Sequence, residues 1–188
     1  MPSSENILQQ ISGHTSQSSL PPVELWNPDF CGDMNMQIKA NGDWWHEGTP
    51  IGRKKLFKLF STIIKKEDDD YFLVTPVEKI GIQVEWKPFV IIDFDVKEIN
   101  SKSVFQFTDN CDNVILLEKP NQLELSLFNN EKLPTINVRR NLYASFTRSC
   151  YYRLIDIAEP VEKNGSTVIK IKSNGHDFIL GEFNESSI

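Results

Sequence analysis

From residue 71 to about residue 138, apolar and polar residues alternate in short runs separated by turn residues. In residues 80–86 every second side chain is apolar, and residues 90–96 repeat the pattern after a Lys87-Pro88 turn. A period of two is typical of β-strands that bury one face. Because the connections are too short for βαβ crossovers, the pattern predicts an antiparallel meander. Further strands of this meander are predicted in residues 103–107, 113–118 and 122–128.

Two helices are predicted, one before the meander and one after it. The first spans 50–66, with Thr49 as its N-cap and Pro50 at the first helical position, where a missing N–H costs nothing. A second helix is predicted to begin after Asn141 and to end before Pro160. The apolar face of the first helix is formed by Leu56, Phe57, Leu59, Phe60, Ile63 and Ile64.

The last part of the chain predicts a hairpin around Asn174-Gly175, because these residues accept the positive φ angles of a type I′ turn. The fold class expected is therefore α+β. It has a central antiparallel β meander, open or partly closed into a barrel, flanked by two main helices and followed by the C-terminal hairpin. We expect residues 1–20 to form a flexible tail, 21–79 an N-terminal subdomain with the first helix, and 80–188 a second subdomain.

The composition is that of an ordinary globular chain, with 39% hydrophobic and 24% charged residues among 188. These values argue against wholesale disorder and against a coiled coil. No apolar run is long enough to span a bilayer. No charged n-region followed by an apolar h-region is found near residue 1, so a secretory signal is not expected. We expect a cytoplasmic protein without a membrane span, and homo-oligomerisation stays open.

The three cysteines, Cys31, Cys111 and Cys150, show none of the paired spacings of a zinc site or a redox motif. We interpret them as reduced thiols that pack as small hydrophobes. Neither His46 with Glu47 nor the Asp93/Asp95 pair has a metal-ligand spacing. The sequence therefore predicts no metal site and no cofactor.

The net charge of −6 argues against a general nucleic-acid binder, which would present a basic field. One segment differs from this average: residues 53–66 contain six basic residues and no acidic one. On the predicted helix, Lys54, Lys58 and Lys65 lie opposite the apolar face. This basic helix could bind an anionic lipid or nucleic-acid surface, or it could simply be a solvated helix face.

Arg53 is the most unusual residue of this helix, because the helical wheel places it among apolar side chains near the positive end of the helix dipole. A negative partner is expected nearby. The first candidate is an internal salt bridge with Glu78. The second is an anionic ligand held by Arg53 and the free amides of the helix start.

Two segments resemble a known family. The stretch "GDWWHEGTPIGR" and the stretch "YFLVTPVEK" are similar to motifs of the bacterial family called domain of unknown function 1285, and the resemblance covers about residues 20–182. The resemblance implies a shared fold and no catalytic role. The matching positions are Gly42, Trp44, Gly48, Pro50, Ile51, Arg53, Tyr71, Thr75, Pro76, Glu78 and Lys79.

The leading hypothesis is a non-enzymatic module that binds either a small ligand or a partner protein. The small ligand considered is an anion. Its site is expected near the Trp44–Arg53 turn and the Thr75–Lys79 segment. One alternative is an enzyme acting on a small anionic substrate, with Glu78 or His46 as acid or base. Another is a surface binder that uses the basic helix. The candidate ligand-binding residues are Trp44, His46, Arg53, Tyr71, Thr75 and Glu78.

Overall fold

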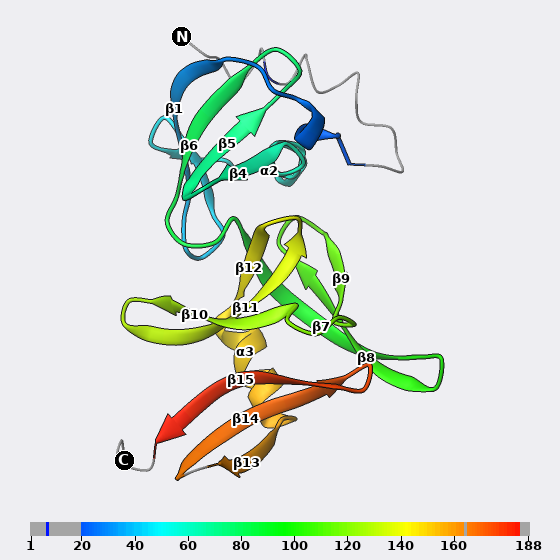
Figure 1. The fold of residues 1–188 in the computed structure, drawn as a ribbon. Helices are drawn as coiled ribbons and strands as arrows, with labels where there is room; N and C mark the ends of the chain where they lie inside the picture. The colour runs from blue at the N-terminus through cyan, green and yellow to red at the C-terminus, as the bar shows by residue number, and fades with distance from the viewer. Residues whose placement is uncertain (1–6, 8–19, 164, 185–188) are drawn as a thin grey trace. The chain divides into compact units, whose positions relative to one another are not determined.

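The computed structural model describes residue 7, residues 20–163 and residues 165–184 (Figure 1). The chain folds into two compact units, Met1–Pro88 and Phe89–Ile188. This division falls later than the boundary expected after residue 79, because the strand that follows pairs within the first unit. The predicted tail, residues 1–20, lies outside the described residues except for residues 7 and 20. Of these two, Ile7 is helical and fully buried.

The described part of the first unit forms a single sheet with one α-helix. The strands follow the order β3-β2-β1-β6-β5-β4, in which only β1 and β6 pair in parallel. Figure 1 labels β1, β6, β5 and β4 of this sheet. The elements are η1 (Val23–Leu25), β1 (Phe30–Ile38), β2 (Trp44–His46), β3 (Thr49–Pro50), α2 (Lys54–Ser61), β4 (Ile64–Glu67), β5 (Asp70–Val74) and β6 (Lys79–Val84).

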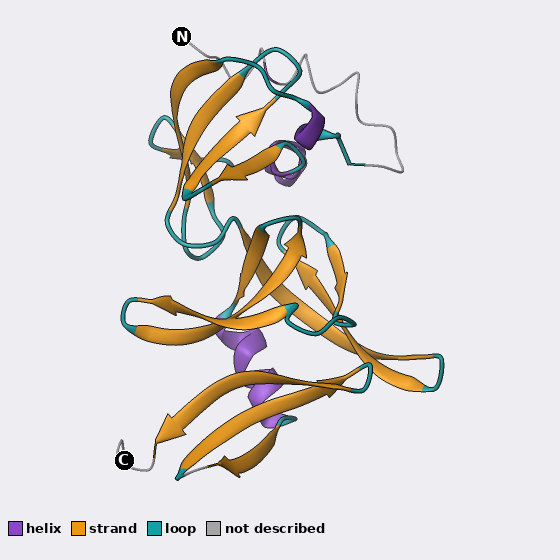
Figure 2. Ribbon diagram, in the orientation of Figure 1, coloured by secondary structure: helices purple, strands orange, loops and turns teal. Residues whose placement is uncertain are grey.

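The described part of the second unit has a six-stranded sheet, a helix and a three-stranded sheet. The sheet orders are β10-β11-β12-β7-β8-β9 and β13-β14-β15. The helix α3 lies between the two sheets (Figure 2), where it contacts β7 and where the Tyr151 hydroxyl donates to the Leu180 carbonyl (3.3 Å). The elements are β7 (Phe89–Ile99), β8 (Lys102–Asp109), β9 (Val114–Leu116), β10 (Leu123–Phe128), β11 (Glu131–Arg139), β12 (Leu142–Phe146), α3 (Arg148–Asp156), β13 (Glu159–Lys163), β14 (Ser166–Ser173) and β15 (His176–Asn184).

The two six-stranded sheets are built in the same way. Each consists of two three-stranded antiparallel runs, and one parallel pair joins the runs: β1 with β6 in the first sheet and β7 with β12 in the second. The α+β class and the antiparallel pairing are confirmed. The strands expected to form one central meander are instead divided between two sheets, with the break before β7.

The first helix is shorter than predicted. Thr49 and Pro50 do not start it, because they form the edge strand β3, and a tight turn at Glu47-Gly48 with φ angles of 50° and 71° returns the chain from β2. Proline is tolerated on an edge strand, where its missing N–H faces no partner. The helix ends at Ser61, and residues 64–67 form β4, so the predicted span of 50–66 is wrong at both ends.

The second helix is also shorter than predicted. Asn141 does not cap it, because residues 142–146 form β12, which pairs with β11 and with β7. The N-cap is Thr147, whose hydroxyl oxygen accepts from the Cys150 amide (3.4 Å). Apolar residues spaced by four are compatible with one continuous helix and also with a strand followed by a helix. The local sequence pattern therefore could not distinguish these two structures.

The C-terminal hairpin is confirmed. Ser173 pairs with His176, which leaves Asn174 and Gly175 as a two-residue turn. Their φ angles of 50° and 84° match the left-handed conformation that a type I′ turn requires.

Each unit has its own apolar core. The largest fully buried side chains of the first unit are Ile7, Met36, Ile38, Trp44, Phe60, Ile63, Ile64, Leu73 and Ile80. The core of the second unit includes Phe89, Ile91, Phe107, Ile136, Leu142, Ala144, Leu154 and Leu180. Among the residues that the structure describes, no helix has the length and apolar character needed to cross a membrane.

The cysteines differ in exposure, and this predicts their reactivity. All three are free thiols; Cys111 and Cys150 are buried, whereas Cys31 is exposed. Burial raises the pKa of the Cys150 thiol to about 11, and a protonated, buried thiol reacts slowly. We expect Ellman's reagent to modify one thiol, Cys31, in the native protein and three in denaturant. Rapid native labelling that persists in a Cys31→Ser variant would contradict this.

Candidate functional site

Two of the predicted site residues, Trp44 and Thr75, are buried and stabilise the fold of the first unit. Trp44 is 2% exposed, and its ring stacks on Phe57 and Phe60 at centroid distances of 6.3 and 6.4 Å. Thr75 is buried and closes the β5–β6 turn, since its hydroxyl oxygen accepts from the Glu78 amide (3.0 Å). Neither side chain is placed to contact a ligand at the surface.

The predicted residues do not form one constellation. His46 lies on β2 and Tyr71 on β5, and β1 and β6 separate these strands in the sheet. Three strand spacings of about 4.8 Å place the two residues roughly 14 Å apart. His46 and Glu78, each considered as the acid or base of an enzyme, also do not lie together, because His46 pairs opposite Met36, whereas the turn that carries Glu78 adjoins the Phe30 end of β1.

Arg53 and Glu78 do not form the expected ion pair. Within the described part of the chain, no hydrogen bond or ion pair involves the Arg53 guanidinium. The reason is the position of α2. Its C-terminal end adjoins the turn that contains Glu78, as shown by the bond from the Val74 amide to the Ile63 carbonyl (3.0 Å). Arg53 lies at the opposite end of this eight-residue helix, about 12 Å away.

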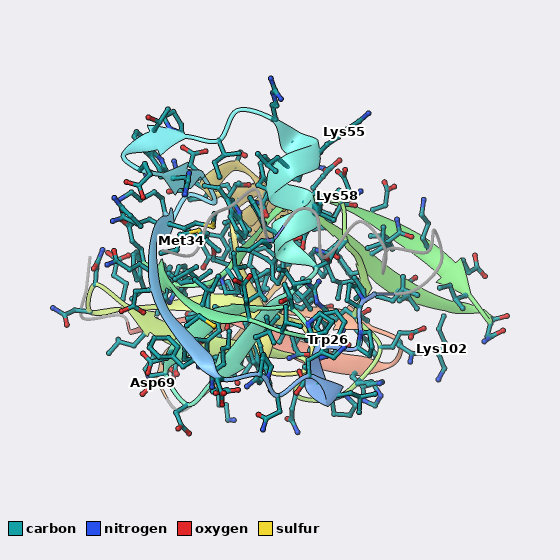
Figure 3. The ribbon with its side chains drawn as sticks, turned by 90° about the horizontal axis from the view of Figure 1, so that it is seen from above. Trp26, Met34, Lys55, Lys58, Asp69 and Lys102 are labelled. Atoms are coloured by element: carbon teal, nitrogen blue, oxygen red, sulfur yellow. The ribbon has the colours of Figure 1, made fainter. Side chains whose placement is uncertain are left out.

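Arg53 is the N-cap residue of α2 and not a member of its apolar face. It is exposed, and it is followed directly by Lys54 and Lys55, which are also exposed. No capping hydrogen bond from a side chain is found at this helix start among the residues that the structure describes, and the first turn of α2 contains no acidic residue. Lys58 follows one turn later, and Figure 3 shows Lys55 and Lys58 leaving α2 on the same side. We call residues 53–55 with Lys58 the basic helix start.

Tyr71 lines a separate cavity of about 400 Å³ on the sheet of the first unit. Gly81 forms part of its floor, where an added Cβ would collide with the Asp33 carboxylate. Burial, together with the charge of Asp69, raises the pKa of the Tyr71 hydroxyl, so this group remains a hydrogen-bond donor at neutral pH. The cavity is lined by Phe30, Asp33, Asp70, Tyr71, Phe72, Lys79, Gly81 and Ile82.

The charges around this cavity do not suit an anion. Asp33 and Asp70 contribute carboxylates. The lysine that lines it, Lys79, already binds Glu67 (2.9 Å) and lies 4.9 Å from the centroid of the Phe72 ring. The charges at the basic helix start therefore favour an anionic ligand more than the charges around Tyr71 do.

The second unit contains a larger cavity, of about 620 Å³, which the sequence reasoning missed. Its charged lining residues are Glu118 and Lys119, before β10, and Arg139 and Arg140, at the β11–β12 turn; three amide side chains and Tyr143 of β12 also line it. The signal available in the sequence was the Arg139-Arg140 pair beside Asn141, which was interpreted as the start of a helix. Among the described residues, no group of three or more His, Cys, Asp or Glu side chains is placed to hold a metal ion.

Comparison with solved structures finds two similar proteins. A DUF1285 family protein from Silicibacter pomeroyi DSS-3 is 35% identical, with a TM-score of 0.79 and 96% of each chain covered. A DUF1285 family protein from Shewanella baltica OS155 is 28% identical, with a TM-score of 0.52, covering 65% of this chain and 91% of that one. No curated protein matches the sequence.

Two family models match in sequence. Residues 21–88 match "Domain of unknown function (DUF1285), N-terminal domain" and residues 88–180 match "Protein of unknown function (DUF1285), C-terminal domain". The models meet at residue 88, where the two compact units divide. Because the two matches cover most of the chain, the protein belongs to the DUF1285 family.

Proposed function

We propose that this protein is a non-enzymatic binding module, and that the basic helix start of the first unit recognises a small anionic ligand of the phosphate type. The observation that carries the proposal is the sequence of charges at this end of α2. Three consecutive cations, residues 53–55, occupy a helix start that has no cap side chain and no acidic residue in its first turn.

This arrangement opposes the usual rule for helix termini. The N-terminal end of a helix carries a partial positive charge and favours carboxylates, so cations there repel it. Sequences break such local rules mainly where function requires it. A bound phosphate would reverse the sign of the effect, because the exposed cations Arg53 and Lys55 and the first-turn amides would then lie next to an anion.

Other predicted residues fit this site to different degrees. Trp44 supports it indirectly, by stacking beneath α2 on Phe57 and Phe60. His46 is half-buried on the neighbouring strand β2, which joins β3 immediately before the helix. Tyr71, Thr75 and Glu78 lie elsewhere in the unit, and the proposal gives them no contact with the ligand.

A surface binder of lipid or nucleic acid is the second candidate, and the same basic helix start favours it. The two candidates differ in the ligand and in salt dependence. A lipid or nucleic-acid surface contacts many charges, so its affinity falls steeply with salt. A single phosphate-type ligand held by two or three groups depends on salt much less.

The proposal is tested by calorimetric titration with inorganic pyrophosphate at low ionic strength. The variant is Arg53→Gln/Lys55→Gln, which removes two exposed cations. We expect its affinity to fall at least tenfold, because one hydrogen bond to a charged group contributes about 1.5–3 kcal/mol. Its melting temperature should stay constant or rise slightly, since two charges that oppose the helix dipole are gone.

The matched control is Lys102→Gln/Lys132→Gln, which removes the same charge from exposed positions of the second unit. It should bind pyrophosphate like the wild type. Equal affinities of the two double variants would contradict the proposal, because only the net charge would then matter. Tight, strongly salt-dependent binding of anionic vesicles or of nucleic acid, without binding of pyrophosphate, would favour the surface binder.

A further inference from the structure

We infer that the second unit holds a separate binding site, in which the cavity between residues 118–122 and the β11–β12 turn takes the carboxylate or phosphate group of a small polar molecule. This site is independent of the basic helix start, because it lies wholly within the second unit. Its lining comes from two chain segments about twenty residues apart and from the whole of β9.

The segment 118–122 forms a preorganised wall. The Gln122 side chain fixes it from inside: its carbonyl oxygen accepts from the amides of Glu118 (3.1 Å) and Lys119 (3.2 Å), and its amide donates to the Leu116 carbonyl (2.8 Å). Asn121 has a φ of 63°, which sharpens the turn. The backbone that carries Lys119 is therefore held in place before any ligand arrives.

The opposite wall carries the two arginines. A register shift between Asn137 and Arg139 interrupts the pairing of β11 with β12. Arg140 then turns the chain with a φ of 51°, and its carbonyl accepts from the Asn137 side chain (2.8 Å). Such bulges redirect side chains relative to a regular strand, and here both Arg139 and Arg140 line the cavity.

The Arg139 guanidinium is fixed by contacts with Asn113 and Phe89. Its Nη1 donates to the Asn113 side-chain oxygen (3.1 Å), and its guanidinium carbon lies 4.7 Å from the centroid of the Phe89 ring. Asn113 in turn donates to the buried Asp109 carboxylate (2.7 Å). A planar guanidinium fixed in this way is suited to a carboxylate or phosphate, which it can bind through two parallel hydrogen bonds.

The charge of the cavity favours an anion. Three cations line it, Lys119, Arg139 and Arg140, against one carboxylate, Glu118, in a chain whose net charge is −6. Burial and the neighbouring Arg140 lower the pKa of Arg139 to about 10, so it remains charged at neutral pH. A bound anion would relieve the repulsion between the two guanidinium groups.

The remaining lining indicates the rest of the ligand. A volume of about 620 Å³ is within the range of small-molecule sites. The lining combines four charged residues, three amides (Asn121, Gln122 and Asn137) and Tyr143 with five apolar residues, among them Ile115 and Val138. Because eight of these thirteen residues are polar or charged, the ligand class that we infer is a small hydrophilic acid or a phosphorylated polyol.

The test is calorimetric titration of the full chain with two probes, citrate and glucose 6-phosphate. We expect at least one probe to bind, and Arg140→Gln to weaken that binding at least tenfold. Arg140 is exposed, so this variant should fold normally, and Lys119→Gln should act in the same direction. The better probe shows whether carboxylate or phosphate is preferred, and either preference agrees with the inference.

Two controls decide the location. Lys132→Gln removes an exposed cation of β11 that does not line the cavity, and it should bind like the wild type. Because the basic helix start is itself proposed to bind phosphate groups, the titrations are repeated in the Arg53→Gln/Lys55→Gln background, in which Arg140→Gln should still weaken binding at least tenfold. The inference is overturned if neither probe binds at millimolar concentration in this background, or if Lys132→Gln weakens binding there as much as Arg140→Gln does.

Discussion

Replacing Trp44 by alanine is expected to destabilise the first unit by about 3–5 kcal/mol, the cost found when large buried aromatic side chains are truncated. The ring is 2% exposed and stacks on both Phe57 and Phe60. Its removal would leave a cavity between β2 and α2 that the rigid sheet cannot fill. Urea unfolding followed by circular dichroism measures the loss.

Two further variants separate packing from hydrogen bonding. The Trp44 indole N–H is buried without an acceptor in the described structure, so Trp44→Phe loses ring area and no hydrogen bond, at about 1–2 kcal/mol. The neighbouring Trp45 is half-buried on the other face of the strand, and Trp45→Ala should cost clearly less than Trp44→Ala. Equal losses for the two alanine variants would contradict the placement of Trp44 in the core.

Replacing Asp109 by alanine is the second large effect expected, at about 3–5 kcal/mol for a buried charged group that holds a network. Asp109 is fully buried. Its carboxylate accepts from the Cys111 amide (2.8 Å), the Asn113 amide (2.9 Å) and the Asn113 side chain (2.7 Å). It also attracts Arg139. An Asp95→Ala control, at an exposed position, should change the unfolding midpoint little.

The same residue predicts a pH dependence. Burial raises the pKa of Asp109 above its ordinary value, while the bonds from Asn113 and Cys111 and the charge of Arg139 oppose the shift. A carboxyl whose folded pKa is raised binds its proton more readily in the folded state. The wild type should therefore gain stability relative to Asp109→Asn as the pH falls from neutral through the raised pKa. A difference that shrinks over this range would contradict the prediction.

The local features of the fold could be predicted from the sequence, and the long-range pairings could not. The Asn174-Gly175 turn and the alternation that marks β6 depend only on neighbouring residues, and both were predicted. The parallel pairing of β1 with β6 and of β7 with β12 brings together residues about fifty positions apart. No local pattern reports such a pairing, so one meander was expected where two sheets form.

Irregular strands account for part of the difference. Residues 90, 92, 94 and 96 were expected to share a buried face, yet Ile92 is 40% and Val96 is 50% exposed. A register shift between Ile91 and Asp93 in the pairing of β7 with β8 changes which side chains face the core, since a slip by one residue reverses the two faces of a strand.

The site residues show the same limit. Arg53 was expected on the apolar face of the first helix, but α2 begins at Lys54, four residues later than predicted, so Arg53 is its N-cap residue and does not lie on the apolar face. The cavity of the second unit was missed because a turn and a bulge bring Arg139 and Arg140 toward Lys119. Helical periodicity through residues 141–158 concealed that turn.

The central claim, that the basic helix start binds a phosphate-type anion, is tested most directly by amide NMR during titration with pyrophosphate. We predict saturable chemical-shift changes at the amides of Lys54 and Lys55, at the same concentrations as the calorimetric binding, and their loss in Arg53→Gln/Lys55→Gln. Amides of Lys54 and Lys55 that do not shift, while pyrophosphate binds elsewhere in the chain or does not bind at all, would contradict the claim.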